Sequence, residues 1–179
     1  LLFLNNDTIH EPNWIEPLVN LIVNDEKIAS VQPKILNIKN KNQFDYAGGS
    51  GGFIDILCYP FTRGRIFNYI EYDTNQYNDK TEIFWASGCA FITRKDLFLS
   101  ILFDNKLFTY MEEIDYHWKT ILQNYKNLVE PQSVIYHDGE SLDASTFLKS
   151  YFNHRNSMIL FLSNHNIFIM LLLFIPKIL

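Results

Sequence analysis

The chain has 179 residues, of which 47% are hydrophobic and 20% charged, so it is long enough for one globular domain with its own core. This composition excludes a disordered or low-complexity chain. The 15 Lys and Arg residues against 20 Asp and Glu give a net charge of −5, and no long basic run occurs. We therefore expect no nucleic-acid partner.

The two cysteines, Cys58 and Cys89, lack the spacing of a zinc site or a disulfide framework. They favour a reducing compartment. The chain has no initiator Met and opens on the apolar Leu1–Leu4, which resembles the middle of a strand rather than a natural start. We interpret the sequence as part of a longer protein, in which a missing signal peptide carries no information.

The first predicted elements are a strand, a polar turn and a helix. Leu1–Leu4 is typical of a fully buried strand, and the polar residues after it place Asp7 at the strand's C-terminal edge. After Pro12, apolar residues recur at helical spacing as far as Ile22. Pro12 suits the first turn of this helix, and Glu11 stands near the positive end of its dipole.

The middle of the chain predicts short strands and an irregular segment. Ile28–Gln32 indicates a second short strand that ends at Pro33. Residues 44–65 hold five glycines among aromatic residues, which indicates a long functional loop or an irregular hairpin. Ile83–Thr93 predicts a strand interrupted by small residues, with a short helix starting near Lys95.

A further helix is predicted to begin at the acidic cluster 112–115, because apolar residues recur at helical spacing behind it. Leu128–Glu130 and Ser133–Tyr136 predict short strands on either side of Pro131. Strands that alternate with helices favour an α/β layered fold with a more mixed later part.

The C-terminal region predicts a last long helix and an apolar tail. The helix spans about Ser145 to Ser163, capped by Asp143 or Ser145. Ile167–Ile175 is an unbroken apolar run, far shorter than the roughly 20 residues that span a bilayer. It could be an interfacial helix, the start of a spanning helix, or a segment buried against another part of the protein. We therefore divide the chain into residues 1–165 and an apolar, membrane-proximal candidate segment, 166–179.

Several acidic residues and one histidine could carry chemistry. Asp7 could hold Mg²⁺ or Mn²⁺ bridged to a diphosphate, or it could form an Asx turn. Glu112, Glu113 and Asp115 stand within four positions, and like charges raise one another's pKa, which suits a general acid or base. The alternative is that acids favour a helix's first turn. His137 precedes a turn and is either a metal or phosphate contact or a structural histidine.

Two further groups could bind a substrate. Trp85, Ser87 and Gly88 could form a pocket wall in which the glycine admits a ligand against the backbone, or they could pack in an ordinary core. Arg63 and Arg65 suit bidentate contacts with phosphate or carboxylate, or they are solvated loop charges.

Six segments, taken in order, carry a family resemblance. They are Leu-Asn-Asn-Asp-Thr (4–8), Glu-Pro-Asn-Trp-Ile (11–15), Trp-Ala-Ser-Gly-Cys-Ala-Phe-Ile-Thr-Arg (85–94), Met-Glu-Glu-Ile-Asp-Tyr-His-Trp (111–118), Val-Ile-Tyr-His-Asp-Gly (134–139) and Tyr-Phe-Asn-His-Arg-Asn (151–156). Together they resemble the family 2 inverting glycosyltransferases, most closely the bacterial rhamnosyltransferase-like members that build surface polysaccharides.

This resemblance implies a GT-A fold, a mixed sheet with flanking helices. It implies that the Asp-x-Asp motif, reduced here to its last acid, Asp7, binds Mg²⁺ or Mn²⁺ and the donor diphosphate, with His137 nearby. Glu113, the second member of the acidic pair, would be the base that deprotonates the acceptor hydroxyl, and Asp115 would support the loop or contact the acceptor. Residues 85–88 would line the sugar and acceptor pocket.

The partners implied are a UDP- or dTDP-linked sugar donor and a glycan or lipid-linked acceptor, with peripheral association at the inner face of the plasma membrane. In the family, the strands that hold the nucleotide base precede the Asp-x-Asp strand. We therefore expect this chain to be the C-terminal part of a catalytic domain and to be inactive alone. Two alternatives remain open: a glycoside hydrolase that uses Asp7 and Glu113 as its carboxylate pair, and a non-catalytic carbohydrate-binding or scaffold module.

Overall fold

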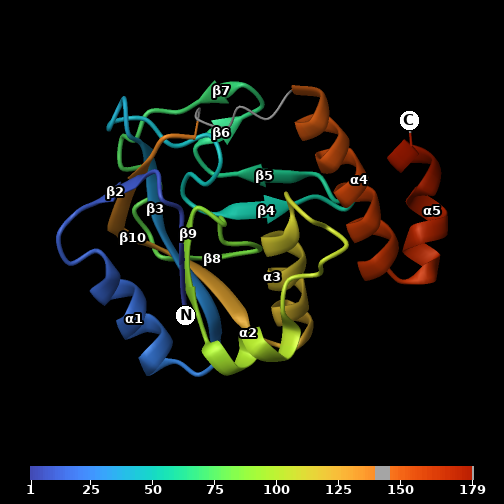
Figure 1. The fold of residues 1–179 in the computed structure, drawn as a ribbon, viewed down its shortest axis with the longest axis horizontal. Helices are drawn as coiled ribbons and strands as arrows, with labels where there is room; N and C mark the ends of the chain where they lie inside the picture. Colours follow the sequence, from blue (N-terminus) through green and yellow to red (C-terminus); the bar gives the residue numbers. More distant parts are fainter. Residues whose placement is uncertain (140–145, 179) are drawn as a thin grey trace.

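The computed structural model describes residues 1–139 and 146–178, which form a mixed sheet with helices packed around it (Figure 1). In chain order the elements are β1 (Leu2–Leu4), β2 (Thr8–His10), α1 (Ile15–Asn24), β3 (Ile28–Asn37), β4 (Gly52–Ile54), β5 (Pro60–Thr62), β6 (Arg65–Ile66), β7 (Tyr69–Ile70), β8 (Thr81–Ile83), β9 (Ala90–Thr93), α2 (Lys95–Ile101), α3 (Glu112–Leu122), β10 (Lys126–His137), α4 (Thr146–Asn164) and α5 (Ile167–Ile178).

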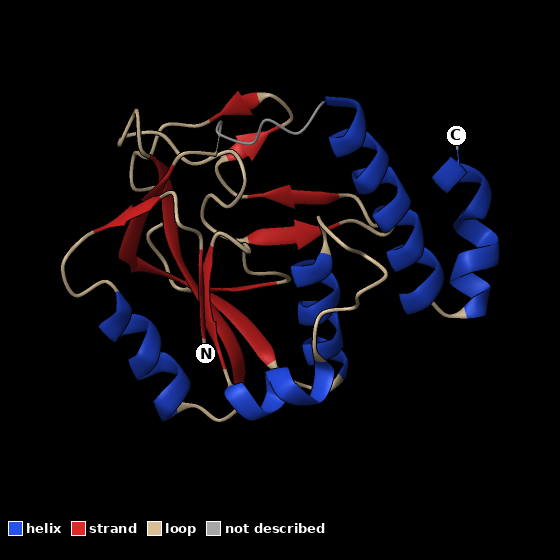
Figure 2. Cartoon of the chain, viewed as in Figure 1, coloured by secondary structure: helices blue, strands red, loops and turns tan. Residues whose placement is uncertain are grey.

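The main sheet has the strand order β1-β9-β3-β10-β2, with β8 also paired to β10. Only β3 and β10 are parallel neighbours, and the other pairs are antiparallel. Trp14, which directly precedes α1, and Leu18 of α1 pack against one face of the sheet, while Tyr116 of α3 joins Phe91 and Val129 in a cluster on the sheet. Figure 2 shows helices on both sides of the strands. The α/β class with a mixed sheet is as the sequence predicted.

Strands β3 and β10 both continue through a proline at which the sequence predicted a strand end. Strand β3 runs on through Pro33, and β10 is one strand rather than two pieces around Pro131. The register between them shifts between Glu130 and Val134. Proline lacks an N–H group and is tolerated at such an irregularity, because no ladder bond is required there. These two predicted boundaries were therefore wrong.

The N-terminal elements differ from the prediction in two ways. Strand β1 forms, but Leu2 is 42% exposed because β1 lies at the edge of the sheet and pairs only with β9. Helix α1 begins at Ile15 rather than near Pro12, since Asn13 has a left-handed φ of 58° that interrupts the helical path. Glu16, rather than Glu11, is the acid in the first turn.

The glycine-rich stretch forms an irregular hairpin, β4 with β5, as predicted. Its Gly52 lies so close to Trp85 that a Cβ atom would be 2.1 Å from the indole ring, so only glycine fits there. The Trp85 Nε1–H also donates to the carbonyl of Phe53, at 2.8 Å. The hairpin is thus fixed directly onto Trp85.

Helices α4 and α5 lie side by side at the edge of the molecule beyond α3 (Figure 1). The predicted long helix is confirmed as α4, and its predicted caps, Asp143 and Ser145, lie outside the described residues. Met170 and Leu173 of α5 pack inward, whereas Phe168 is 81% exposed. Among the described helices, none combines the length and the apolar character that a membrane crossing requires.

Helix α4 holds the loop that leads into the acidic cluster. The Nδ2 group of buried Asn156 donates to the carbonyls of Leu107, Thr109 and Tyr110, at 2.6–2.9 Å. Arg155 donates to the carbonyl of Leu107 as well, at 2.8 Å. Phe108, Tyr110 and Met111 have left-handed φ angles of 63° to 69°, a costly conformation outside glycine that surrounding bonds must maintain.

We predict that Asn156→Asp destabilises the fold by about 1–3 kcal/mol, because it replaces a buried donor by an oxygen that faces several carbonyls. Thermal unfolding measures this loss. Asn153→Asp is the matched control, since the Asn153 side chain donates within its own helix, to the carbonyl of Lys149. An unfolding temperature equal to that of the wild type would show that Asn156 does not hold the loop.

Candidate active site

A cleft of about 350 Å³ opens where segments far apart in the sequence meet. The loop after β3, the hairpin strand β5, the start of α3, the end of β10 and helix α4 all contribute to its wall. The lining side chains used below are Tyr46, Tyr59, Arg65, Trp85, Tyr110, Met111, Glu113, His137, Lys149 and His154. The predicted site residues Glu113, His137, Trp85 and Arg65 therefore share one cleft.

His137, at the end of β10, lies between two aspartates. Its Nδ1 atom is 3.2 Å from Oδ1 of Asp45, and its Nε2 atom is 3.4 Å from Oδ1 of Asp7. Burial by itself would lower the pKa of His137, but the hydrogen bond to Asp45 and the charges of Asp45 and Asp7 raise it. Gly139 leaves room for this arrangement, because a Cβ atom there would be 2.9 Å from Oδ1 of Asp45.

The pairing of β3 with β10 brings Asp45 to His137. Asn37 at the end of β3 pairs with His137, so the two strands end at the same edge of the sheet. The chain then turns back, and the N–H of Asp45 donates to the carbonyl of Ile35, at 3.0 Å. The Asp45 side chain is fully buried and also accepts the N–H of Ala47, at 2.7 Å.

The side chains of Asp7 and His137 suit the role of ligands to a divalent cation whose remaining ligands include the oxygens of a diphosphate. With Nδ1 3.2 Å from Oδ1 of Asp45, the Nε2 atom is turned toward Asp7, where it can serve as a metal ligand, as in many metal-binding histidines. The 3.4 Å between Nε2 and the Asp7 oxygen suits two ligands of one ion. Across residues 1–139 and 146–178, no three His, Cys, Asp or Glu side chains form a metal site by themselves. Mg²⁺ commonly takes few protein ligands and completes its shell with substrate phosphates and water.

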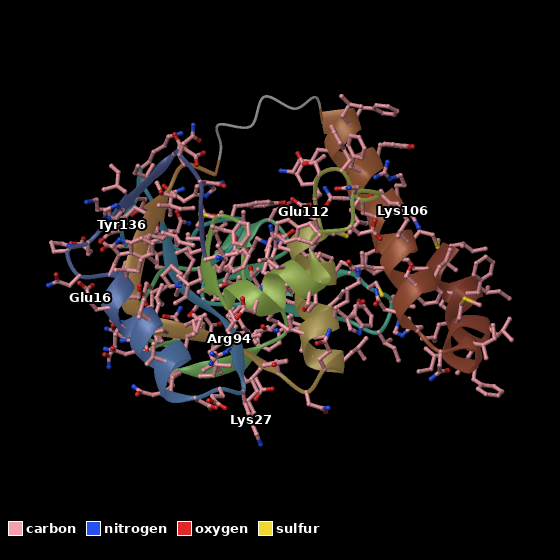
Figure 3. All side chains as sticks on the ribbon, turned by 60° about the horizontal axis from the view of Figure 1, so that its bottom comes forward. Glu16, Lys27, Arg94, Lys106, Glu112 and Tyr136 are labelled. Carbon is pink, nitrogen blue, oxygen red and sulfur yellow. The ribbon has the colours of Figure 1, made fainter. Side chains whose placement is uncertain are left out.

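Glu113 lies in the first turn of α3, as the sequence predicted, and faces the cleft. Burial and the neighbouring charge of Glu112 raise its pKa from 4.5 to about 8, although the N–H of Gly88 donates to the carboxyl group and opposes the shift. Burial also raises the pKa of Glu112, which stands at the start of α3 in Figure 3. Glu113 can therefore take up or release a proton near neutral pH.

The backbone of Glu113 is held from inside the protein. The Nδ1–H group of buried His117 donates to the carbonyl of Glu113, at 2.6 Å. Burial lowers the pKa of His117 to about 3, so the ring is neutral at physiological pH. His117 is packed edge-on against the rings of Phe91 and Tyr116. This anchor fixes the first turn of α3 relative to the sheet.

Other predicted site residues lie behind the cleft wall. Ser87 is buried; its hydroxyl donates to the carbonyl of Ala47 at 3.1 Å, and its N–H donates to Oε1 of Gln32 at 2.8 Å. Gly88 faces Glu113, since a Cβ atom there would lie 3.9 Å from the Glu113 carboxyl carbon. These two residues position the wall rather than line it.

Arg63 and Asp115 are not brought to the cleft. Arg63 donates to the carbonyl of Ser50, at 2.8 Å, and to the hydroxyl of Thr81, at 3.3 Å. Asp115 is buried and pairs with Lys119 one turn further along α3, at 2.5 Å. Both side chains stabilise local structure, and their predicted roles toward a substrate have no support in this geometry.

Asp45 is the site residue that sequence reasoning missed. It stands alone in a glycine-rich segment, with no neighbouring acid or histidine to mark it. The one available signal was its place next to the Tyr46-Ala47-Gly48 stretch, in a segment that was interpreted as a long functional loop or an irregular hairpin. Lys149 and His154 also line the cleft and were not predicted as site residues, although His154 lies in segment 151–156, which carries the family resemblance.

The comparisons with known proteins concern the fold. No family model matches the sequence, and no curated protein matches it. Among solved structures, the crystal structure of GalNAc-T7 with UDP, GalNAc and Mn²⁺ is similar, with a TM-score of 0.56 and 18% sequence identity. The match covers 76% of this chain and 27% of that chain, so the sequence spans about a quarter of the length of its neighbour. The chain thus has the mixed α/β architecture of a GT-A glycosyltransferase domain.

Proposed function

We propose that this chain carries the catalytic centre of an inverting, rhamnosyltransferase-like glycosyltransferase of family 2. The donor would be a UDP- or dTDP-linked sugar, and the acceptor a hydroxyl of a glycan or lipid-linked glycan in surface polysaccharide synthesis. One observation carries the proposal: Glu113 and His137, from elements far apart in the sequence, line one cleft. The GT-A fold supports the same proposal, because the similar structure of GalNAc-T7 contains UDP, GalNAc and Mn²⁺.

The side chains of Asp7 and His137 would hold Mg²⁺ or Mn²⁺ together with the donor diphosphate. When bound, the ion would stabilise the negative charge of the departing diphosphate. The chain's own part is to fix the ligands: Asp45 orients the imidazole, and Asn5 lies 3.5 Å from its Nε2 atom. The buried carboxylate of Asp45 and the partly exposed one of Asp7 flank one histidine and make this end of the cleft suited to a cation.

Glu113 would act as the general base. Its side chain is half-buried at the cleft wall, which Tyr110, Met111 and Trp85 also line. A hydroxyl group is a weak nucleophile, and a carboxylate with a raised pKa is a stronger base than an ordinary one. Attack from the side opposite the leaving diphosphate would invert the anomeric carbon.

We expect Asp7→Asn to abolish metal-dependent donor binding in the full-length protein, since the substitution removes the carboxylate that faces His137. Calorimetric titration of UDP- and dTDP-sugars with and without Mn²⁺ measures this. Asp104→Asn is a matched control, because Asp104 caps a turn at Lys106. A wild-type protein that binds none of the donors would count against a transferase and favour a carbohydrate-binding module. Turnover of an unactivated glycoside in EDTA would favour a hydrolase.

Turnover of the full-length protein should rise with pH until Glu113 loses its proton, near pH 8. Glu113→Gln should lower turnover by roughly 10²- to 10⁴-fold without changing donor affinity. Steady-state rates across pH with saturating donor measure both effects. Unchanged turnover in this variant would refute the assignment of the base.

The same substitution has an effect on stability that is independent of activity. The folded-state pKa of Glu113 lies above the ordinary 4.5, so the wild type loses stability as the pH rises from about 4.5 to about 8. Glu113→Gln removes this penalty. We therefore expect the variant to gain in unfolding temperature over the wild type between these two pH values and to match it in mild acid. A constant difference across pH would show that Glu113 is not buried as described.

A further inference from the structure

Two cations in the cleft share one aromatic ring. The guanidinium carbon of Arg65 lies 4.0 Å from the ring centroid of Tyr46, and the Nζ atom of Lys149 lies 5.1 Å from the same centroid. Arg65 comes from β6 and Lys149 from α4, so the tertiary structure brings them together. Contact with an aromatic face fixes a cation without neutralising it.

No carboxylate neutralises this pair within residues 1–139 and 146–178, where the ion pairs involve other cations, such as Lys34 and Lys119. The protein has more acids than bases, with a net charge of −5, so acidic partners are not scarce. In the part of the chain that the structure describes, Glu113 is the one acid that lines the cleft. Two like charges held near one ring repel each other, and an anion placed between them would relieve that repulsion.

The position of Arg65 separates this pair from the proposed metal ligands. A second cavity of about 580 Å³ shares Tyr46, Tyr59 and Arg65 with the cleft but does not include His137. Arg65 therefore stands where the cleft continues away from His137. A donor diphosphate held at Asp7 and His137 would occupy the other end, so Arg65 and Lys149 face the region left for the acceptor. Asp55 also lines the second cavity, where its carboxylate accepts the backbone N–H groups of Leu57 and Tyr59.

We propose that Arg65 and Lys149, held on Tyr46, form an anion-binding subsite for an acceptor that carries a phosphate or carboxylate group. The identification of the ligand as an acceptor rests on the proposed function, whereas the anion site itself does not depend on it. Arg65 would bind the anion through its planar fork and Lys149 as a point charge. The hydroxyl to be glycosylated would then lie toward Glu113.

The test compares the binding of three sugars to the full-length protein in EDTA: a hexose phosphate, a hexuronate and the neutral hexose. We expect an anionic sugar to bind roughly 10- to 100-fold more tightly than the neutral one. Whichever of the two anionic sugars binds more tightly identifies the group as phosphate or carboxylate. Equal binding of all three sugars would overturn the proposal.

The Arg65→Gln, Lys149→Gln double variant should lose the preference for anionic sugars and keep the donor affinity of the wild type. Lys41→Gln is the matched control, because Lys41 lies 4.4 Å from the ring centroid of Tyr136, which does not line the cleft. A double variant that binds donor more weakly would assign the cations to the donor diphosphate instead and overturn the acceptor subsite. A wild type that prefers anionic sugars but binds no donor would leave the anion site standing and refute the transferase.

Discussion

The parallel pairing of β3 and β10 is the constraint on which the site depends. Parallel strands end at the same edge of a sheet, so residues that follow β3 and residues at the end of β10 meet although about ninety positions separate them. Asp45 and His137 touch for this reason. Both strands carry a proline, and the pairing tolerates them because its register shifts at that point.

A second constraint concerns charge in a partly buried cleft. Glu113 keeps a proton near neutral pH because burial and Glu112 disfavour its ionised form. His137 is protonated more readily because Asp45 and Asp7 flank it, in spite of its burial. One end of the cleft thus favours a bound cation, whereas the ring of Tyr46 holds two cations that favour an anion. Ligand groups of opposite charge would bind at separate places in one cleft.

Helix α4 both supports the loop before α3 and contributes to the wall of the cleft. Asn156 and Arg155 hold the strained loop before α3 by its carbonyls, and Lys149, about two turns earlier on the same helix, lines the cleft. The left-handed conformations of Phe108, Tyr110 and Met111 would be costly without such bonds, because residues with a Cβ atom rarely adopt that conformation. The orientation of Glu113 therefore depends on a helix that begins more than thirty residues later.

The sequence by itself determined the α/β class, the helix that begins at Glu112, the place of Asp7 in a turn after the first strand and that of His137 at a strand end, because hydrophobic periodicity and polar residues at strand boundaries are local signals. It placed strand ends at Pro33 and Pro131 because proline cannot donate an N–H group to a neighbouring strand. Only the pairing of β3 with β10 shows that no such hydrogen bond is needed at these positions. It also counted Arg63 with Arg65, although only the latter lines the cleft, since the paths of β5 and β6 decide which guanidinium group reaches it. Asp45 could be recognised only in the tertiary structure, because its role arises from contact with a histidine that long-range strand pairing brings to it.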